Sequence, residues 1–407
     1  MKLLRNIVVV IVLASPIVSA DDAGNLRSKA GKGDKSRVHK VRKGDSIQDA
    51  IDDADPGDII KVWPGVYTEQ ASSLYGLRIS TNNIKLMAKG GPGSVRLIAS
   101  GAQETGVYAA PEGCEYKDNN CDEEILENFS IEGFSVEGFP VNGIQTRWVD
   151  GFIVENCYSV GNLNNGIYPT LSSNGRIAGS TASGSLDAGL WIAGSADITA
   201  LDNEIYESTT GFEVTVSRNL YVSNNKIHDN TVGIGLYHPN MAGTKPDWTT
   251  YENWTFEGNH VYENNLPNPA PPDTFQYGLE PGVGALLIGV SSHTIEGNIF
   301  DGNGWAGIIV AGYCTVVQLA FGSDCTNSPP INGDPSANFN SIVGNKISDS
   351  GSSPALGLPG ADILYVQVPT ELLAADENCF TNNTSIDGSQ DATTFAPFLP
   401  LSVAGCD

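Results

Sequence analysis

The stretch from Gly143 to Tyr237 contains five related segments: GIQTR at 143–147, GIYPT at 166–170, GLWIA at 189–193, GFEVT at 211–215 and GIGLY at 233–237. Their glycines are spaced by 23, 23, 22 and 22 residues. A fixed period of this length is typical of stacked supersecondary units. Apolar residues alternate with other residues within most of these segments, as in a half-buried strand. The chain is therefore predicted to be a repeat protein built from short strands.

A second repeating position follows most of these glycines by 13 or 14 residues. It is occupied by Asn156, Asn203 and Asn225, and Ser180 takes the place after Gly166. About 22 residues are too few for a strand and a packed helix, except in a leucine-rich repeat, whose pattern is missing. The remaining interpretation is a coil in which each repeat is one turn. The Asn side chains then stack in one column, since Asn tolerates left-handed turn geometry.

These glycine segments and this Asn column resemble those of the right-handed parallel β-helix superfamily, which has the pectin-lyase-like fold. The resemblance covers most of the chain after about Val38. The predicted fold class is all-β, a right-handed parallel β-helix solenoid. Residues one and three after each glycine are expected to fill the core, and residues two and four after it to point outward. A short helix over residues 47–54 is expected to cap the open N-terminal end, which would otherwise expose an unpaired strand edge.

Residues 1–20 are predicted to be a signal peptide, with Lys2 and Arg5, an apolar run and a small-residue cleavage site ending at Ala20. Residues 21–43 are expected to be a flexible basic leader. Residues 44–407 are expected to form one β-helix domain with a C-terminal tail. No later run is apolar enough to span a bilayer. The mature protein is therefore expected to be secreted, periplasmic or on the cell surface.

The net charge of −25 is unevenly distributed. The segment from Arg27 to Lys43 carries eight Lys and Arg, and only 12 follow in residues 44–407. Nucleic acid is not an expected partner, because phosphate binding needs a basic surface. The acidic body favours solubility.

Seven cysteines fit an oxidising compartment. Proximity in the sequence pairs Cys114 with Cys121, Cys314 with Cys325, and Cys379 with Cys406. Cys157 remains, and we expect it to be a buried thiol because it follows an Asn of the column.

Insertions after Gly106, Gly233 and Gly307 are expected to rise as walls on one side of the coil. Between the first two walls, the positions two after each glycine form an outward column: Tyr108, Gln145, Tyr168, Trp191, Glu213 and Gly235. A row of aromatic side chains about 5 Å apart offers a stacking surface for sugar rings. The expected substrate-binding residues are Tyr108, Gln145, Arg147, Tyr168 and Trp191. A packed face under a loop or the tail is an equally weighted alternative.

The expected catalytic residues are Glu213, Tyr237, His238 and Lys245. Glu213 lies one rung from Tyr237, and His238 follows directly in the sequence. Lyase or epimerase chemistry on a uronic acid mainly demands positioned proton transfer. Glu213 is suited to bind an acid, a hydroxyl or Ca²⁺, and the other three to act as base or acid. Arg147 would lie four rungs from Tyr237, about 19 Å, and so at a separate subsite.

Other motifs are missing from the chain. There is no His/Cys spacing typical of zinc, no EF-hand or RTX-type motif, no Asp-Pro-His-Asp signature of β-helix alginate epimerases and no polygalacturonase pattern of paired aspartates. A fold hosts many activities, so the resemblance does not decide the function. Two functions stay open: an exported lyase- or epimerase-like enzyme acting on acidic polysaccharide, and a non-catalytic surface protein that binds glycan or protein with the same face.

Overall fold

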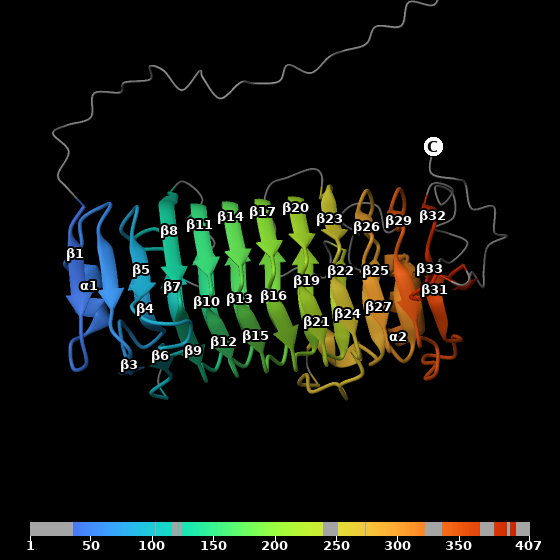
Figure 1. The fold of residues 1–407 in the computed structure, drawn as a ribbon, viewed down its shortest axis with the longest axis horizontal. Coiled ribbons are helices and arrows are strands. Elements are labelled where there is room, and N and C mark those ends of the chain that lie inside the picture. Colours follow the sequence, from blue (N-terminus) through green and yellow to red (C-terminus); the bar gives the residue numbers. More distant parts are fainter. Residues whose placement is uncertain are drawn as a thin grey trace, which may run out of the picture. The chain divides into compact units, whose positions relative to one another are not determined.

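Three long sheets build the structure, a computed structural model that describes residues 36–101, 103–115, 121, 124–238, 251–272, 274–321, 336–366, 378–388 and 391–395. The predicted signal peptide, Lys245, Cys325, Cys406 and most of the expected leader lie outside these described residues. Each rung of the coil contributes one strand to each sheet, and the strands follow one another in sequence order along the coil (Figure 1). Neighbouring strands pair in parallel, as β19 does with β22. The predicted parallel β-helix is confirmed.

Sheet A contains β1 (Val38–Val41), β2 (Ile59–Val62), β5 (Lys85–Ala88), β8 (Leu126–Glu132), β11 (Val149–Glu155), β14 (Ser173–Ala178), β17 (Ala196–Leu201), β20 (Arg218–Ser223), β23 (Trp254–Glu257), β26 (Thr294–Glu296), β29 (Ser341–Val343) and β32 (Cys379–Thr381). Sheet B contains β3 (Gly65–Tyr67), β6 (Val95–Ile98), β9 (Phe134–Glu137), β12 (Tyr158–Val160), β15 (Thr181–Ser183), β18 (Glu204–Tyr206), β21 (Lys226–His228), β24 (His260–Tyr262), β27 (Ile299–Asp301), β30 (Lys346–Ser348) and β33 (Thr384–Ser385).

Sheet C contains the glycine segments. Its strands are β4 (Tyr75–Ile79), β7 (Thr105–Ala109), β10 (Asn142–Arg147), β13 (Asn165–Thr170), β16 (Ala188–Ala193), β19 (Thr210–Thr215), β22 (Val232–Tyr237), β25 (Val283–Ile288), β28 (Ala306–Ala311), β31 (Ala361–Val366) and β34 (Thr394–Phe395). Three helical segments accompany the sheets in the described residues: α1 (Ile47–Asp52), η2 (Phe275–Gly278) and α2 (Tyr313–Phe321). None of these helices in the described chain is long and apolar enough to cross a membrane.

The core lies inside the coil, where the sequence placed it. The inward residues that the glycine register predicts are at most 1% exposed: Ile167, Leu190, Ile192, Phe212, Val214, Ile234 and Leu236. They belong to one continuous apolar cluster that also takes in inward residues of sheets A and B. Burial of this apolar surface is the main force that stacks the rungs.

A buried column of hydrogen-bonding side chains lies in the turn between sheets A and B. It consists of Cys157, Ser180, Asn203, Asn225, Asn259, Asn298, Asn345 and Asn383. The Asn225 backbone N–H donates to Asn259 Oδ1 at 2.9 Å, and the other rungs repeat this bond. The prediction that Asn156 joins the column is wrong by one residue. Asn156 has a left-handed φ of 53°, like Gly179 in the next rung, and Cys157 takes the buried position.

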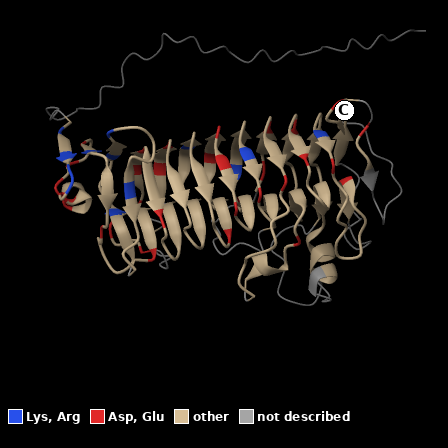
Figure 2. Cartoon of the chain, turned by 60° about the horizontal axis from the view of Figure 1, so that its bottom comes forward, with Lys and Arg blue, Asp and Glu red and all other residues tan. Residues whose placement is uncertain are grey.

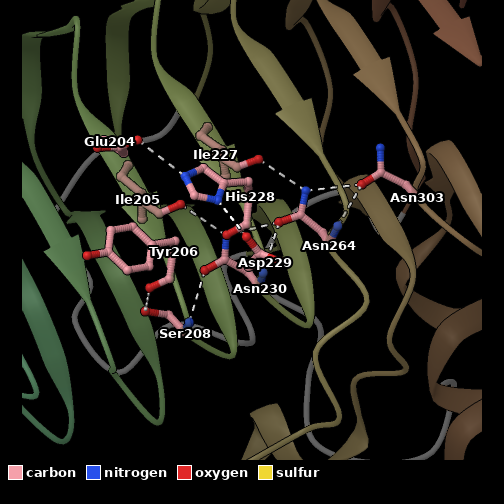
Figure 3. A network of polar contacts seen from close by, with 10 residues as sticks. All are labelled: Glu204, Ile205, Tyr206, Ser208, Ile227, His228, Asp229, Asn230, Asn264 and Asn303. Carbon is pink, nitrogen blue, oxygen red and sulfur yellow. Dashed lines mark hydrogen bonds and ion pairs between the residues drawn. The ribbon is translucent and has the colours of Figure 1, made fainter.

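A second column, which the sequence analysis missed, lies in the turn between sheets B and C. Its members are Asn162, Ser185, Ser208, Asn230, Asn264 and Asn303. Figure 3 shows four of them in a row, with the Ser208 N–H donating to Asn230 Oδ1 at 3.0 Å. Apart from Ser185, these side chains satisfy buried backbone groups in the turns, which would otherwise be costly.

The N-terminal end is closed by α1, as predicted. Ser46 caps the helix by accepting a bond from the Asp49 N–H, and Ile47 and Ile51 are buried. The strand β1 already pairs with β2, so the coil begins before Gly44, within the segment expected as leader. Asp58 fixes this start, because it accepts bonds from the backbone and side chain of Arg37 and contacts His39 Nε2 at 2.9 Å.

One of the three expected cysteine pairs is confirmed within the described residues. Cys114 and Cys121 form a disulfide, with their Cα atoms 5.5 Å apart. Cys314 and Cys379 are also disulfide-bonded, and their expected partners lie outside the described residues. Cys157 is a buried free thiol, as predicted, and burial raises its pKa to about 12.

Candidate functional site

The outer face of sheet C carries the predicted column. The strand register aligns Tyr108 with Gln145, and Gln145 with Tyr168. It also aligns Trp191 with Glu213, and Glu213 with Gly235. The structure therefore brings the expected side chains into one line that runs across the strands. We call the part of this face from β7 to β22 the column face.

The N-terminal end of the column face is covered. Tyr108 is fully buried and stacks on Tyr75 with ring centroids 4.4 Å apart. These two rings pack with Cys114 of the disulfide loop. The Arg78 guanidinium lies 5.1 Å from the Tyr108 ring centroid. Tyr108 is thus part of a packed end and offers no open ring face to a sugar.

The middle of the column face is only partly open. Tyr168 stacks on Trp191 at a centroid distance of 4.6 Å. Tyr168 and Arg147 are at most 4% exposed, and Gln145 is completely buried. Trp191 is half-buried, and its Nε1 donates to Thr215 Oγ1 at 3.0 Å. Of the five expected substrate-binding residues, only Trp191 therefore reaches solvent appreciably.

Two carboxyl groups meet beside Trp191. Glu213 lies on β19 and is 2% exposed, whereas Asp187, in the turn before β16, is half-buried. In the described part of the chain, neither Asp187 Oδ1 nor Glu213 Oε2 has a hydrogen-bond partner, although both atoms are buried. Glu213 does accept one bond, from the Gln276 side chain that follows Phe275 of η2. Buried carboxyl oxygens normally have a hydrogen-bond partner, so these two carboxyl groups are an exception that needs an explanation.

Burial changes the acidity of both groups. Loss of hydration raises the pKa of Asp187 to about 7. Burial, and then the charge of Asp187, raise the pKa of Glu213 well above its ordinary value, while the bond from Gln276 opposes this rise. Two carboxyl groups that lie close together in a low-dielectric environment cannot both ionise easily. Near neutral pH the pair thus holds both a proton donor and a proton acceptor.

Tyr237 completes this cluster, and Gly235 makes room for it. A Cβ added to Gly235 would overlap the ring and hydroxyl of Tyr237, so the phenol lies across Gly235, the strand neighbour of Glu213. The Tyr237 hydroxyl is 3.3 Å from Thr210 Oγ1, and its ring meets Phe275 edge-on at 5.4 Å. Burial, and then the charge of Glu213, raise the pKa of Tyr237. Its phenol therefore stays protonated beside the carboxyl pair.

The histidines lie elsewhere. His238 is 1% exposed and stacks on Tyr313 of α2 at 4.6 Å. His293 is buried against Trp254, and His228 lies on the outer face of sheet B between Glu204 and Asp229 (Figure 3). The fourth expected catalytic residue, Lys245, falls outside the described residues. Among the four, the structure brings Glu213 and Tyr237 together.

Asp187 was missed in the sequence analysis. It stands two residues before Gly189, and the same position in the other rungs holds Val141, Asn164, Thr209 and Thr231. Asp187 is the only charged residue among these five positions, and it lies one rung before Glu213. This was the signal in the sequence that could have identified it. The alternation rule gave no direction for a side chain in a turn, so the residue was passed over.

The site shows little sign of a metal. No group of three or more His, Cys, Asp or Glu side chains among the described residues is placed to hold an ion. Lys and Arg occupy few positions on the drawn strands (Figure 2).

Comparison with known proteins agrees with this architecture. Residues 65–242 match the family described as right handed beta helix region. The A-module of mannuronan C-5 epimerase AlgE6 from Azotobacter vinelandii is similar in structure, with a TM-score of 0.58 and 15% identity over 87% of this chain and 91% of that one. The AlgE4 A-module from the same organism has a TM-score of 0.55 and 16% identity over 86% and 88% of the two chains.

A protein of a different kind is similar too. PfbA, a surface adhesin of Streptococcus pneumoniae, has a TM-score of 0.52 and 11% identity over 83% of this chain and 80% of that one. Sequence comparison with curated proteins finds no match. At such low identities the likeness shows the fold and leaves the activity open. The chain is a right-handed parallel β-helix protein with the pectin-lyase-like fold.

Proposed function

We propose that this protein is an exported carbohydrate-active enzyme, in which Asp187 and Glu213 perform acid–base chemistry on a polysaccharide. The observation that carries the proposal is the buried carboxyl pair with raised pKa values and unpartnered oxygens. Perturbed carboxyl groups of this kind are typical of functional sites. Trp191, half-buried and adjacent to Glu213 on the strand register, offers an aromatic surface for a sugar. The disulfide between Cys114 and Cys121 supports export, since such bonds persist in oxidising compartments.

The pair suits hydrolysis of a glycosidic bond. That reaction needs one protonated carboxyl to give its proton to the leaving oxygen and one carboxylate to activate water or attack the sugar. A carboxyl with a pKa near 7 is well placed for the first role at neutral pH. A uronic acid would add a third carboxylate to the same place, so a neutral sugar is favoured at this subsite.

The lyase or epimerase activity expected from the sequence stays a prediction. It would need a positive group beside the substrate carboxylate, besides a base. Arg147 is four strands from Tyr237 in sheet C, and Lys245 lies outside the described residues. The described site therefore supplies the acid and the base and leaves the positive group unassigned.

A substrate screen tests the proposal. Purified mature protein is incubated with neutral glucans and xylans and with alginate and pectate, with and without Ca²⁺. New reducing ends report hydrolysis. Absorbance near 235 nm reports the unsaturated product of elimination, and proton NMR reports epimerised sugars. We expect turnover that falls by at least about 100-fold in Glu213→Gln and in Asp187→Asn. The matched control is Glu257→Gln, because Glu257 is exposed on sheet A and bonds Tyr221.

The screen has outcomes that contradict the proposal. Turnover that survives both carboxyl substitutions would place the chemistry elsewhere. No turnover on any polysaccharide would remove the enzyme from consideration under these conditions.

Burial of the column face favours a second candidate, a non-catalytic glycan- or protein-binding module. Tyr108 and Gln145 are completely covered, as expected of a packed face and not of an open groove. This candidate predicts saturable retention on an immobilised glycan that Trp191→Ala weakens, while Glu213→Gln leaves it unchanged.

A further inference from the structure

Positive charges gather on the first strands of sheet A, although the chain as a whole has a net charge of −25. Lys40 lies on β1 and Arg42 directly follows it, Lys61 lies on β2, and Lys89 directly follows β5. Lys61 is half-buried, and the other three side chains are exposed. Figure 2 shows blue on the first strands of the coil. We call these four residues, together with Trp63, the basic end patch.

The basic end patch is one outward surface of three neighbouring strands. The register aligns Lys40 with Lys61. It continues one residue past the ends of β1, β2 and β5, which places Arg42, Trp63 and Lys89 in a second row. Both rows point to the same side, because side-chain direction repeats every two residues along a strand. Neighbours within a row are about 5 Å apart.

Trp63 lies between the two cations of its row and contacts both. The Arg42 guanidinium carbon is 5.7 Å from the ring centroid, and Lys89 Nζ is 4.4 Å from it. A cation over an aromatic ring is attracted by the charge distribution of the ring. This attraction offsets the mutual repulsion of Arg42 and Lys89, so the row presents two positive groups in a fixed place.

The four cations of the patch are not paired with acids. Among the residues that the structure describes, none of them forms an ion pair. By contrast, the nearby Arg37 contacts Asp55 and Asp58, and Lys85 contacts Glu132 at 3.0 Å. Like charges that lie directly opposite each other in a sheet are destabilising. The fold thus keeps a costly arrangement that an external anion would relieve.

Acidic residues limit the patch without neutralising it. Asp49, Asp52 and Asp53, on α1 or directly after it, are exposed, and Glu132 lies on β8, the next strand of sheet A. The residues that precede β1 do not change this balance, because positions 27–35 contain four Lys and Arg and one Asp in the sequence. The positive surface is therefore only three strands wide, about 10 Å between the outer strands.

We infer that the basic end patch binds a polyanionic glycan, a linear polysaccharide that carries carboxylate or sulfate groups. A narrow polymer can follow the three strands and stay clear of Glu132 and the acids of α1. A membrane surface or a nucleic-acid duplex is broader, so it would also meet these acids and be repelled by the acidic body. The inference does not depend on the carboxyl pair of the column face. It adds a second surface, which would fasten the protein to an acidic matrix.

Matched polymers provide the first test. Purified mature protein is titrated with polygalacturonate and with fully methyl-esterified pectin, and likewise with dextran sulfate and with dextran. We expect binding to the charged member of at least one pair and none to either uncharged polymer. The pair that binds tells carboxylate from sulfate. Raising NaCl from about 50 to about 200 mM should weaken the affinity at least about tenfold, as for other polyanions that release counterions.

Neutralising variants locate the binding. Lys40→Gln/Lys61→Gln should raise the Kd at least about tenfold. Its thermal unfolding midpoint should stay the same or rise, because two like charges no longer face each other. The matched control is Lys226→Gln/Lys346→Gln, which makes the same change of net charge on two exposed lysines of sheet B. This control should bind like the natural protein.

A second variant, Arg42→Gln/Lys89→Gln, tests the other row of the patch and should weaken binding as well. If both patch variants bind like the natural protein, or if the control loses as much affinity as they do, the inference is wrong. Binding to phosphatidylglycerol vesicles or to single-stranded DNA, with none to either charged polysaccharide, would also overturn it. Glu213→Gln should bind the polymer normally, so failure of this inference and failure of the proposed function are seen separately.

Discussion

The N-terminal end and the middle of the described coil bury carboxyl groups in opposite ways. At the N-terminal end, Asp58 is 3% exposed and fully partnered: it accepts bonds from the Arg37 N–H at 2.8 Å, Arg37 Nε at 3.1 Å and the Asp55 N–H at 3.1 Å. Burial alone would raise its pKa, but the bonds from His39, Arg37 and Asp55 outweigh this and lower it well below the usual range. Asp187 and Glu213 have few such bonds, and their pKa values rise.

The difference shows which buried charge serves the fold. Removing a carboxylate from water is costly unless hydrogen bonds and opposite charges replace the lost hydration. Asp58 meets this condition and holds β1 and Arg37 to the start of the coil. The pair on the column face does not meet it, so it lowers stability at neutral pH. A local loss of stability of this kind is common at functional sites that need carboxyl groups with shifted pKa values.

The largest stability effect is expected from Asp58→Asn. An amide would set its own N–H group against the N–H donors of Arg37 and Asp55, and breaking a buried charged contact costs about 3 kcal/mol. The first strands should open locally before the rest of the coil. Hydrogen–deuterium exchange of residues 38–41 and 59–62 should therefore speed up by about 100-fold.

The control for this variant is Asp53→Asn, on an exposed residue next to α1. If Asp58→Asn leaves the exchange rate unchanged, the hydrogen-bonded carboxylate of Asp58 contributes no more to the stability of the first strands than an exposed one. The proposed difference between Asp58 and the column-face carboxyl groups would then be wrong.

Asp187→Asn should have the opposite sign. A carboxyl whose pKa rises on folding is most compatible with the folded state below its unfolded pKa of about 3.9, and this contribution is lost as the pH rises through about 7. The uncharged amide avoids that loss. At pH 8 the variant should be more stable than the natural protein by roughly 2 kcal/mol, and at pH 4 the difference should vanish.

Urea denaturation at the two pH values measures this prediction. The contribution of Asp58 to stability has the opposite pH dependence. Because its pKa is lowered on folding, Asp58 stabilises the fold above about pH 4, and this stabilisation is lost on further acidification. A variant Asp187→Asn that is less stable than the natural protein at pH 8 would mean that the carboxylate is partnered after all.

Much of the fold was readable from the sequence. The glycine period predicted the rungs, and each inward residue it named is buried, because alternation fixes side-chain direction once a strand is known. The Asn column was misplaced at Asn156 for a local reason. Asn156 and Cys157 are adjacent, and both a left-handed turn and a buried ladder suit Asn, so the sequence alone gave no reason to prefer Cys157.

The site was less predictable. Glu213 and Tyr237 were found because they stand on strands, where direction is fixed. Asp187 stands in a turn, and no periodicity decides where its side chain points. A covered column face was one of the two expected alternatives, but the residues that cover it could not be named, because Phe275 and Gln276 come from an insertion far along the chain. Contacts between an insertion and a rung have no repeating signature.

The smallest effect is expected from Gly235→Ala, which alters the carboxyl pair without touching it. The new methyl group would occupy the place of the Tyr237 phenol and push it away from Glu213. Small displacements beside reacting groups reduce rates markedly, so we expect kcat to fall by about tenfold with KM unchanged. Gly91→Ala is the control, since a Cβ there would meet no atom within 4 Å. If kcat in Gly235→Ala equals that of the control, Tyr237 only fills space under Phe275, and the chemistry belongs to the two carboxyl groups alone.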